Sequence, residues 1–346
     1  MIWRLCLFVK NNLRLLLEEF VKLNKTPYFN REINAYLLEL IEFTEELIAN
    51  YNTLPADATR LISKILWSAA KYLSGTSIHK VPYEIVYCLK LALDDWNSDP
   101  KLITTALTDD PDFHFMHVNP GVIINLIYPG KNTNKDIIQI AFPTLYRHRP
   151  LYIIALYHEL GHFIDKQFKI TDWSFRSDPV PKDQRKKEEA HRSEYFSDLF
   201  AASYAGKAYL QFLNNFAPGD PTTDSHPSTA DRIDNLNAFL ESRNNTQIDR
   251  INNVLLQLGK PLLALKYTKP ALTDCFDNLR PYTFKNTNEL HGIFEAGFDY
   301  LQSVQSAPNQ LWSKFDEFKR DKVVNDLVEK SIRNKMITEE WSNATA

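Results

Sequence analysis

Two histidines spaced four residues apart constrain this chain more than any other feature. His158 and His162 belong to the run Tyr157-His-Glu-Leu-Gly-His, inside an apolar stretch whose spacing predicts a helix. Residues four apart share one helix face, so both imidazoles can be presented to a single metal ion. Glu159 lies round the helix from this pair, where its carboxylate can act on a metal-bound water instead of binding the metal. The H-E-x-x-H spacing therefore favours a zinc-dependent hydrolase.

A third ligand is needed, because zinc in a hydrolytic site takes three protein ligands and keeps one position open for water. We expect Glu194 to be that ligand. Glu194 and Asp198 are four apart and share one face of a second predicted helix. One carboxylate can bind the metal while the other accepts the N–H of a ligating imidazole. Acids at this spacing also occur on solvated helix faces, which is the alternative interpretation.

Other side chains after the motif could complete the site, namely Asp165, Glu188, Glu189 and His191. Asp165 is the main rival. It lies three residues past His162 on the same helix, so it would point along that helix and reach the metal less easily. His191 would line the cleft or face solvent.

The motif and the downstream acids resemble those of the gluzincins, the thermolysin-like clan of zinc peptidases. That clan has H-E-x-x-H on one helix and E-x-x-x-D on the next, and here Glu194 and Asp198 fill the second motif. The resemblance implies that His158, His162 and Glu194 bind zinc and that Glu159 is the general base. Asp198 would then be the hydrogen-bond partner of one histidine.

A further stretch, Ser225-His226-Pro227-Ser228 followed by Arg232-Ile233, is similar to a segment of the CAAX-prenyl-endopeptidase and heat-shock membrane peptidase group. By that likeness, which covers roughly residues 137 to 240, His226 or Arg232 would stabilise the developing oxyanion. Two departures bear on substrate class. Those peptidases are embedded in membranes, and this chain has a long charged insertion between His162 and Glu194.

Composition and charge limit the partners and the cellular compartment that we expect for this chain. The formal charge of −3 gives no reason to expect nucleic acid as a partner. No stretch reaches the ~18 apolar residues of a membrane span. Three separated cysteines, Cys6, Cys88 and Cys275, fit reduced thiols and a cytoplasmic protein. We therefore expect a peptide or protein substrate, and no span of the membrane.

The predicted fold class is α+β and predominantly α-helical, with a zincin-like catalytic core and helical flanks. Residues 1–110 form an N-terminal helical region, 111–245 the core and 246–346 a C-terminal helical region, packed together or forming one large domain. In the core, strands at 113–118, 122–128 and 137–142 predict a small antiparallel sheet.

The active-site helices are expected to follow this sheet. Arg149-Pro150 opens the first helix, residues 166–187 form a polar excursion, and the second helix spans about 188–212. The charged run at 182–187 is typical of a solvated loop, and it could border a substrate cleft.

The function expected from these observations is peptide-bond hydrolysis by a zinc metallopeptidase. Zinc would lower the pKa of its bound water towards ~7, and Glu159 would take the proton and later deliver it to the leaving amine. The alternative is a zincin-derived binding or regulatory module with restricted or lost turnover. The long helical flanks motivate that alternative, because they could dock a protein partner.

Overall fold

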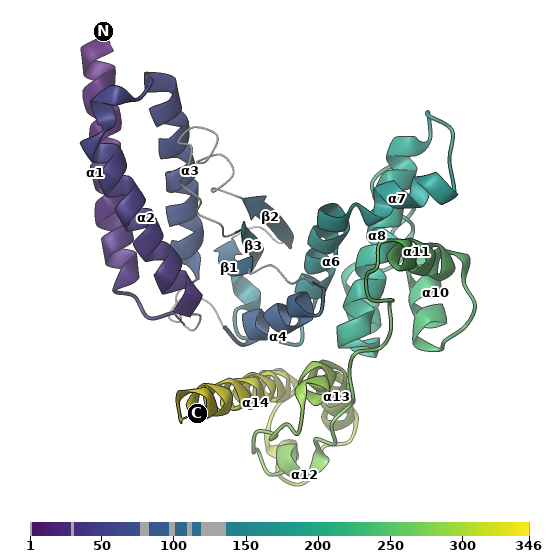
Figure 1. The fold of residues 1–346 in the computed structure, drawn as a ribbon. Coiled ribbons are helices and arrows are strands. Elements are labelled where there is room, and N and C mark those ends of the chain that lie inside the picture. Colours follow the sequence, from purple (N-terminus) through teal and green to yellow (C-terminus); the bar gives the residue numbers. More distant parts are fainter. Residues whose placement is uncertain are drawn as a thin grey trace. The chain divides into compact units, whose positions relative to one another are not determined.

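The computed structural model describes residues 2–28, 31–76, 83–96, 101–108, 113–118 and 136–345. The chain divides into two compact units, whose elements are labelled in Figure 1. Unit 1 comprises Met1–Val86 and Ser98–Thr144, and unit 2 comprises Tyr87–Asn97 and Leu145–Ala346. The predicted core of 111–245 thus includes parts of both units, and its zincin-like architecture stays a prediction.

Unit 1 contains three long helices, which lie side by side in Figure 1: α1 (Ile2–Asn24), α2 (Arg31–Ala49) and α3 (Ala56–Gly75). A short 3-10 turn, η1 (Tyr51–Thr53), joins the last two. Apolar residues at three- and four-residue spacing give each helix one buried face. Leu16, Leu40 and Leu66, one from each helix, are almost completely buried in a single cluster.

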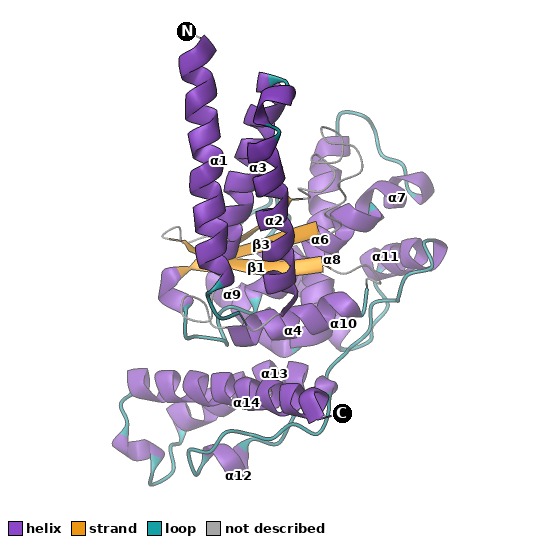
Figure 2. Cartoon of the chain, turned by 60° about the vertical axis from the view of Figure 1, so that its left-hand side comes forward, coloured by secondary structure: helices purple, strands orange, loops and turns teal. Residues whose placement is uncertain are grey.

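Within the described residues, the sheet of unit 1 has three strands in the order β1-β3-β2, drawn in orange in Figure 2. Strand β1 (Lys101–Thr108) pairs in parallel with β3 (Asp136–Pro143), whereas β2 (His114–Val118) pairs antiparallel with β3. The prediction of an antiparallel sheet is therefore wrong, because the sheet is mixed. The predicted strand at 122–128 lies outside the described residues.

Strand β1 was missed because its sequence does not alternate. Leu102, Ile103, Thr104 and Thr105 are four consecutive residues, and all are buried. Burial of both faces is typical of parallel strands, which then lack the alternation of buried and exposed positions that reveals a strand in sequence.

All regular secondary structure in the described part of unit 2 is helical. Its elements are most of α4 (Tyr83–Asp94), α6 (Ala155–Phe168), α7 (Ile170–Ser177), α8 (Arg185–Ala205), α9 (Lys207–Phe216), α10 (Thr229–Leu240), α11 (Thr246–Gln257), α12 (Thr273–Phe276), α13 (Thr287–Ser306) and α14 (Glu317–Thr345). Two short 3-10 helices are also described, η2 (Thr144–Tyr146) and η3 (Trp312–Lys314). The first spans the sequence boundary between the units, at Thr144 and Leu145. Among the described residues, no helix has both the length and the apolar character that crossing a membrane requires.

Three predictions about the active-site helices need correction. Helix α6 begins at Ala155 and not at Arg149-Pro150. The intervening backbone forms turns in which Tyr152 N–H bonds Arg149 O, a spacing of three that belongs to 3-10 geometry. The polar stretch 166–187 is not all loop, since it contains α7.

The predicted helix at 188–212 is in fact two helices. Helix α8 ends at Ala205, and α9 starts at Lys207. Gly206 separates them with a φ of +57°, a left-handed value that residues with a side chain rarely adopt. The break turns α9 away from the axis of α8, which allows a side chain of α9 to reach back towards α8.

Candidate metal centre

Helices α6 and α8 approach each other closely at the motif. A Cβ atom added to Gly161 would lie 2.8 Å from the Cα of Ser197, so the absence of a side chain is what permits this contact. Gly161 lies next to His162, and Ser197 lies next to Asp198. The contact therefore faces the two histidines of α6 towards the two acids of α8.

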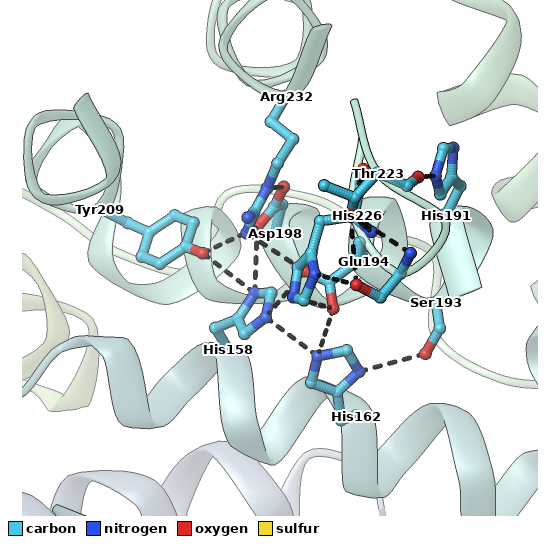
Figure 3. Close-up of polar contacts among 11 residues, drawn as sticks. His158, His162, His191, Ser193, Glu194, Asp198, Tyr209, Thr223, His226 and Arg232 are labelled. Carbon is cyan, nitrogen blue, oxygen red and sulfur yellow. Dashed lines mark hydrogen bonds and ion pairs between the residues drawn. The ribbon is translucent and has the colours of Figure 1, made fainter. Parts of the chain in front are cut away.

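Three side chains converge between the helices (Figure 3). The Nε2 atoms of His158 and His162 are 3.0 Å apart. Glu194 places Oε2 3.4 Å from His158 Nε2 and Oε1 3.1 Å from His162 Nε2. One ligand atom from each residue lies within 4.8 Å of the others, so this group could hold a metal ion.

The other ring nitrogen of each imidazole, Nδ1, also has a hydrogen-bonding partner. His158 Nδ1 lies 3.0 Å from Asp198 Oδ1 and 3.0 Å from Tyr209 Oη. His162 Nδ1 lies 3.1 Å from Ser193 Oγ. A proton on Nδ1 of His158 can be donated to the carboxylate, which leaves the lone pair of Nε2 free to bind a cation.

Asp198 is fixed by two further helices. Arg232 of α10 donates Nε–H and Nη2–H to its carboxylate over 2.7 and 2.6 Å, and Tyr209 of α9 donates its hydroxyl over 2.7 Å. Burial alone would raise the pKa of Asp198, but Arg232 and His158 outweigh it and lower the pKa to about 2. Asp198 is therefore a permanent anion behind His158.

The charges of His158 and Glu194 are coupled. Burial lowers the pKa of His158, but Glu194 and Asp198 together raise it to about 10. Burial raises the pKa of Glu194, yet the two histidines bring it well below its usual value. Glu194 Oε2 is buried and accepts no hydrogen bond of good geometry, and its ion-pair neighbours are His158 Nε2 and Arg232 Nη2, each at 3.4 Å. A buried carboxylate beside two imidazole nitrogens is suited to a cation.

His226 and Arg232 lie on the same side of the site but differ in availability. The His226 side chain is 55% exposed, and its Nε2 is 3.6 Å from Glu194 Oε1. The side chain of Arg232 is 10% exposed, and its guanidinium is bonded to Asp198. Arg232 thus holds the carboxylate of Asp198 in place. Of the two residues, His226 has the side chain that is more accessible to a substrate.

The segment that carries His226 is tied to α8 and α10. His191 Nε2 of α8 lies 2.8 Å from the carbonyl oxygen of Thr223, and Thr223 N–H bonds the carbonyl of His226. Ser228 then caps α10 by accepting the N–H of Asp231. His191 is accordingly an anchor of this loop and contacts its backbone.

The remaining predicted residues are placed as follows. Glu159 is half-buried on α6, next to His158 and outside the group that could bind metal. Asp165, the rival ligand, instead accepts the backbone N–H and the hydroxyl of Thr171 over 2.7 and 2.8 Å, at the start of α7. Its carboxylate is used to connect α6 to α7.

Two contacts of the site were missed from sequence, Tyr209 and Ser193. Ser193 adjoins the predicted ligand Glu194, so its proximity could have been inferred. Tyr209 lies 51 positions from His158 and was placed on the predicted helix 188–212, where no periodicity directs it to the site. The glycine at 206 was the available signal, because a helix break is needed to turn Tyr209 back.

No protein-family model, curated protein or solved structure matches this chain. Function is therefore inferred from the geometry of the site.

Proposed function

We propose that this chain is a zinc-dependent metallopeptidase in which His158, His162 and Glu194 hold the ion. The observation that carries the proposal is the convergence of two Nε2 atoms and one carboxylate at 3.0, 3.1 and 3.4 Å. Zinc bonds of ~2.0–2.1 Å in a tetrahedral site place ligand atoms ~3.3 Å apart, close to these separations. A larger cation such as calcium takes six or more oxygen ligands and does not suit two imidazoles.

The donor set supports a catalytic role over a structural one. Two histidines and one glutamate are three protein ligands, which leaves one position of a tetrahedral site for water or substrate. Structural zinc sites use four protein ligands, usually with cysteine. When bound, zinc would lower the pKa of a coordinated water to ~7 and polarise the scissile carbonyl.

Glu159 would act as the general base. It neighbours His158 on α6, and its half-buried carboxylate is not part of the metal-binding group. A carboxylate there can accept a proton from the attacking water and deliver it to the leaving amine. The resemblance to the gluzincins, in which this position has that role, supports the assignment.

His226 would donate a hydrogen bond to the oxyanion of the tetrahedral stage. Its exposed ring stands beside Glu194, which is the side from which a substrate could approach. A donor aimed at developing negative charge can contribute ~10²-fold or more to the rate. Arg232 would assist by holding Asp198 and Glu194, since its guanidinium contacts both carboxylates.

Cleavage of a broad peptide library tests this function, with metal content measured on the same samples. Wild-type protein should hold one zinc per chain and cleave peptides. Glu159→Gln should keep the zinc and the fold but lose about 10²–10⁴-fold in kcat/KM, because it removes the proton acceptor alone.

Glu189→Gln is the matched control. Glu189 is an exposed glutamate on α8, five residues before Glu194, and the same chemical change there should leave kcat/KM within twofold. A folded protein that takes up no zinc would refute the proposal. Zinc uptake with a stable partner that the wild type never cleaves would favour the binding module instead.

A further inference from the structure

A groove of about 300 Å³ lies along α7, in the same unit as the metal centre. It is lined by Lys169, Asp172, Trp173, Phe175, Arg176 and Arg185. Four of the six are charged, and three of those are cations. The groove includes part of the polar stretch between His162 and Glu194, whose charged run the proposed reaction does not use.

The cations of the groove are held by aromatic rings. The Arg176 guanidinium lies 3.7 Å from the centre of the Trp173 ring, and the Arg185 guanidinium lies 4.5 Å from that of Phe175. Arg192 occupies another position over Phe175 at 4.2 Å. A stacked guanidinium is fixed in orientation, and its N–H edge stays available for a carboxylate.

Within the described part of the chain, these cations lack carboxylate partners. No carboxylate there lies within ion-pair distance of Lys169, Arg176 or Arg185. Asp172, the acid of the groove, forms no ion pair with them. Another nearby acid, Asp178, is already bonded to Arg192 and Arg250. The groove is thus locally positive, although the whole chain has a formal charge of −3.

The groove begins a short distance from the proposed reaction centre. Lys169 follows His162 by seven residues, and α6 continues as a helix until Phe168. At ~1.5 Å per residue, this separates the two by roughly 10 Å along the helix. An extended peptide covers ~3.3 Å per residue, so the groove would meet a substrate about three to five positions from the bond that is cut.

From the stacked, unpaired cations and this location we infer that the groove binds an acidic segment of the peptide substrate. Arg176 and Arg185 present N–H edges to Asp or Glu carboxylates, and Lys169 adds an unfixed positive charge. This inference specifies the substrate class for the proposed function, and its cleavage prediction rests on that function. The binding prediction does not, since it concerns the groove alone.

Fluorescence anisotropy of labelled decapeptides tests the binding. The full-length Glu159→Gln variant is titrated into a glutamate-rich peptide and into the same peptide with every Glu replaced by Gln. The acidic peptide should bind at least tenfold more tightly at low salt, and the difference should shrink as salt screens the exposed charges. Arg176→Gln combined with Arg185→Gln should weaken acidic-peptide binding about tenfold.

Lys186→Gln combined with Lys187→Gln is the control. It removes two exposed cations from the same charged run but not from the groove lining, so its effect should stay within about twofold. Equal losses in the two double variants would overturn the inference, because binding would then depend on net charge alone. Equal affinity for the two peptides, or binding of a phosphopeptide or an oligonucleotide without the acidic peptide, would also overturn it.

Cleavage provides the second measurement. Wild-type protein should prefer substrates with acids three to five positions from the cut, and the groove variant should lose that preference while still cutting the neutral substrate. If nothing is cut but the acidic peptide still binds through the groove, the peptidase proposal fails and the binding site stands. If neutral and acidic substrates are cut equally well, the groove proposal fails and the peptidase proposal stands.

Discussion

At the scale of single residues, the candidate site depends on where protons reside. Asp198 fixes the proton of His158 on Nδ1 through a 3.0 Å contact, and Arg232 keeps Asp198 ionised. Carboxylate partners of this kind raise the basicity of a ligating imidazole and hold its orientation. A buried anion and a buried cation are therefore retained together, each compensating the other.

Replacement of Asp198 by Asn should weaken zinc binding by about 10- to 100-fold, because the amide cannot match the carboxylate as an acceptor. Competition with a chromophoric chelator measures the change. Asp234→Asn, at an exposed position of α10, is the control and should bind zinc as the wild type does. An unchanged affinity in Asp198→Asn would show that Asp198 does not position His158.

Zinc binding should also release a proton. The acids around His158 raise its pKa to about 10, so in the absence of metal its imidazole is protonated at pH 6. A metal can bind Nε2 only after the ring loses one proton. Calorimetric titrations at pH 6, in two buffers of different ionisation enthalpy, should therefore differ by the heat of about one proton per zinc. Apparent affinity should rise as pH rises towards neutrality. Identical heats in both buffers would contradict a charged His158.

At the scale of elements, the motif helices were predictable and their ends were not. H-E-x-x-H and E-x-x-x-D fix which side chains share one face of α6 and one face of α8, because helical spacing alone decides that. Helix α7 escaped detection because it is short and polar residues interrupt its apolar pattern: two of its eight residues are charged, and its buried face includes Thr171 and Ser174 beside Ile170 and Phe175. In sequence, arginines interspersed with aromatic residues give no clear apolar pattern, so the segment resembles a solvated loop.

Contacts between side chains of different helices could not be predicted from the sequence either. Tyr209 and Arg232 both reach Asp198, from α9 and α10. Neither contact follows from the spacing within one helix. His226 or Arg232 was expected at the oxyanion, and in the structure the guanidinium of Arg232 is bonded to the carboxylate of Asp198. Only the packing of α10 against α8 reveals this, and no periodicity encodes it.

The approach of α6 to α8 gives a prediction at this scale. Gly161→Ala would gain up to ~1 kcal/mol of helix propensity. Its Cβ would, however, meet the backbone of Ser197 at 2.8 Å, which cannot move without separating the helices. We expect a lower melting temperature and zinc affinity reduced at least tenfold, measured by thermal unfolding and chelator competition.

Gly297→Ala is the matched control in α13 of the same unit. There the added Cβ would meet side-chain atoms of Leu151 and Val328 at 2.9 and 3.0 Å, and these can rotate away. Zinc affinity should therefore be unchanged in this variant. If Gly161→Ala proves as stable as the wild type and binds zinc equally well, the helices have more freedom than the structure indicates.

At the scale of the whole molecule, the chain divides into two compact units, and the candidate ligands all belong to unit 2. A ligand that binds only the native state stabilises the part that it binds, by ~2.7 kcal/mol at a hundred times its Kd. Removal of zinc should therefore weaken unit 2 and leave the local stability of unit 1 as it was.

Hydrogen exchange measured by mass spectrometry tests this expectation with and without chelator. Peptides from α6, α8 and α10 should exchange faster without zinc, while those from α1, α2 and α3 should be unaffected. Glu159→Gln serves as a control, since it keeps the ligands and should respond like the wild type. Faster exchange in all six helices would contradict a metal effect confined to unit 2.

The separation of the contributing residues along the chain has a consequence for biosynthesis. His158 and Tyr209 meet across 51 positions, and Asp198 and Arg232 across another 34. The ribosome must therefore have synthesised α10 before His158 and His162 can be surrounded by Asp198, Tyr209 and Arg232. We therefore expect the metal ion to bind after this segment has been translated. The ion would enter a folded protein and not a nascent chain.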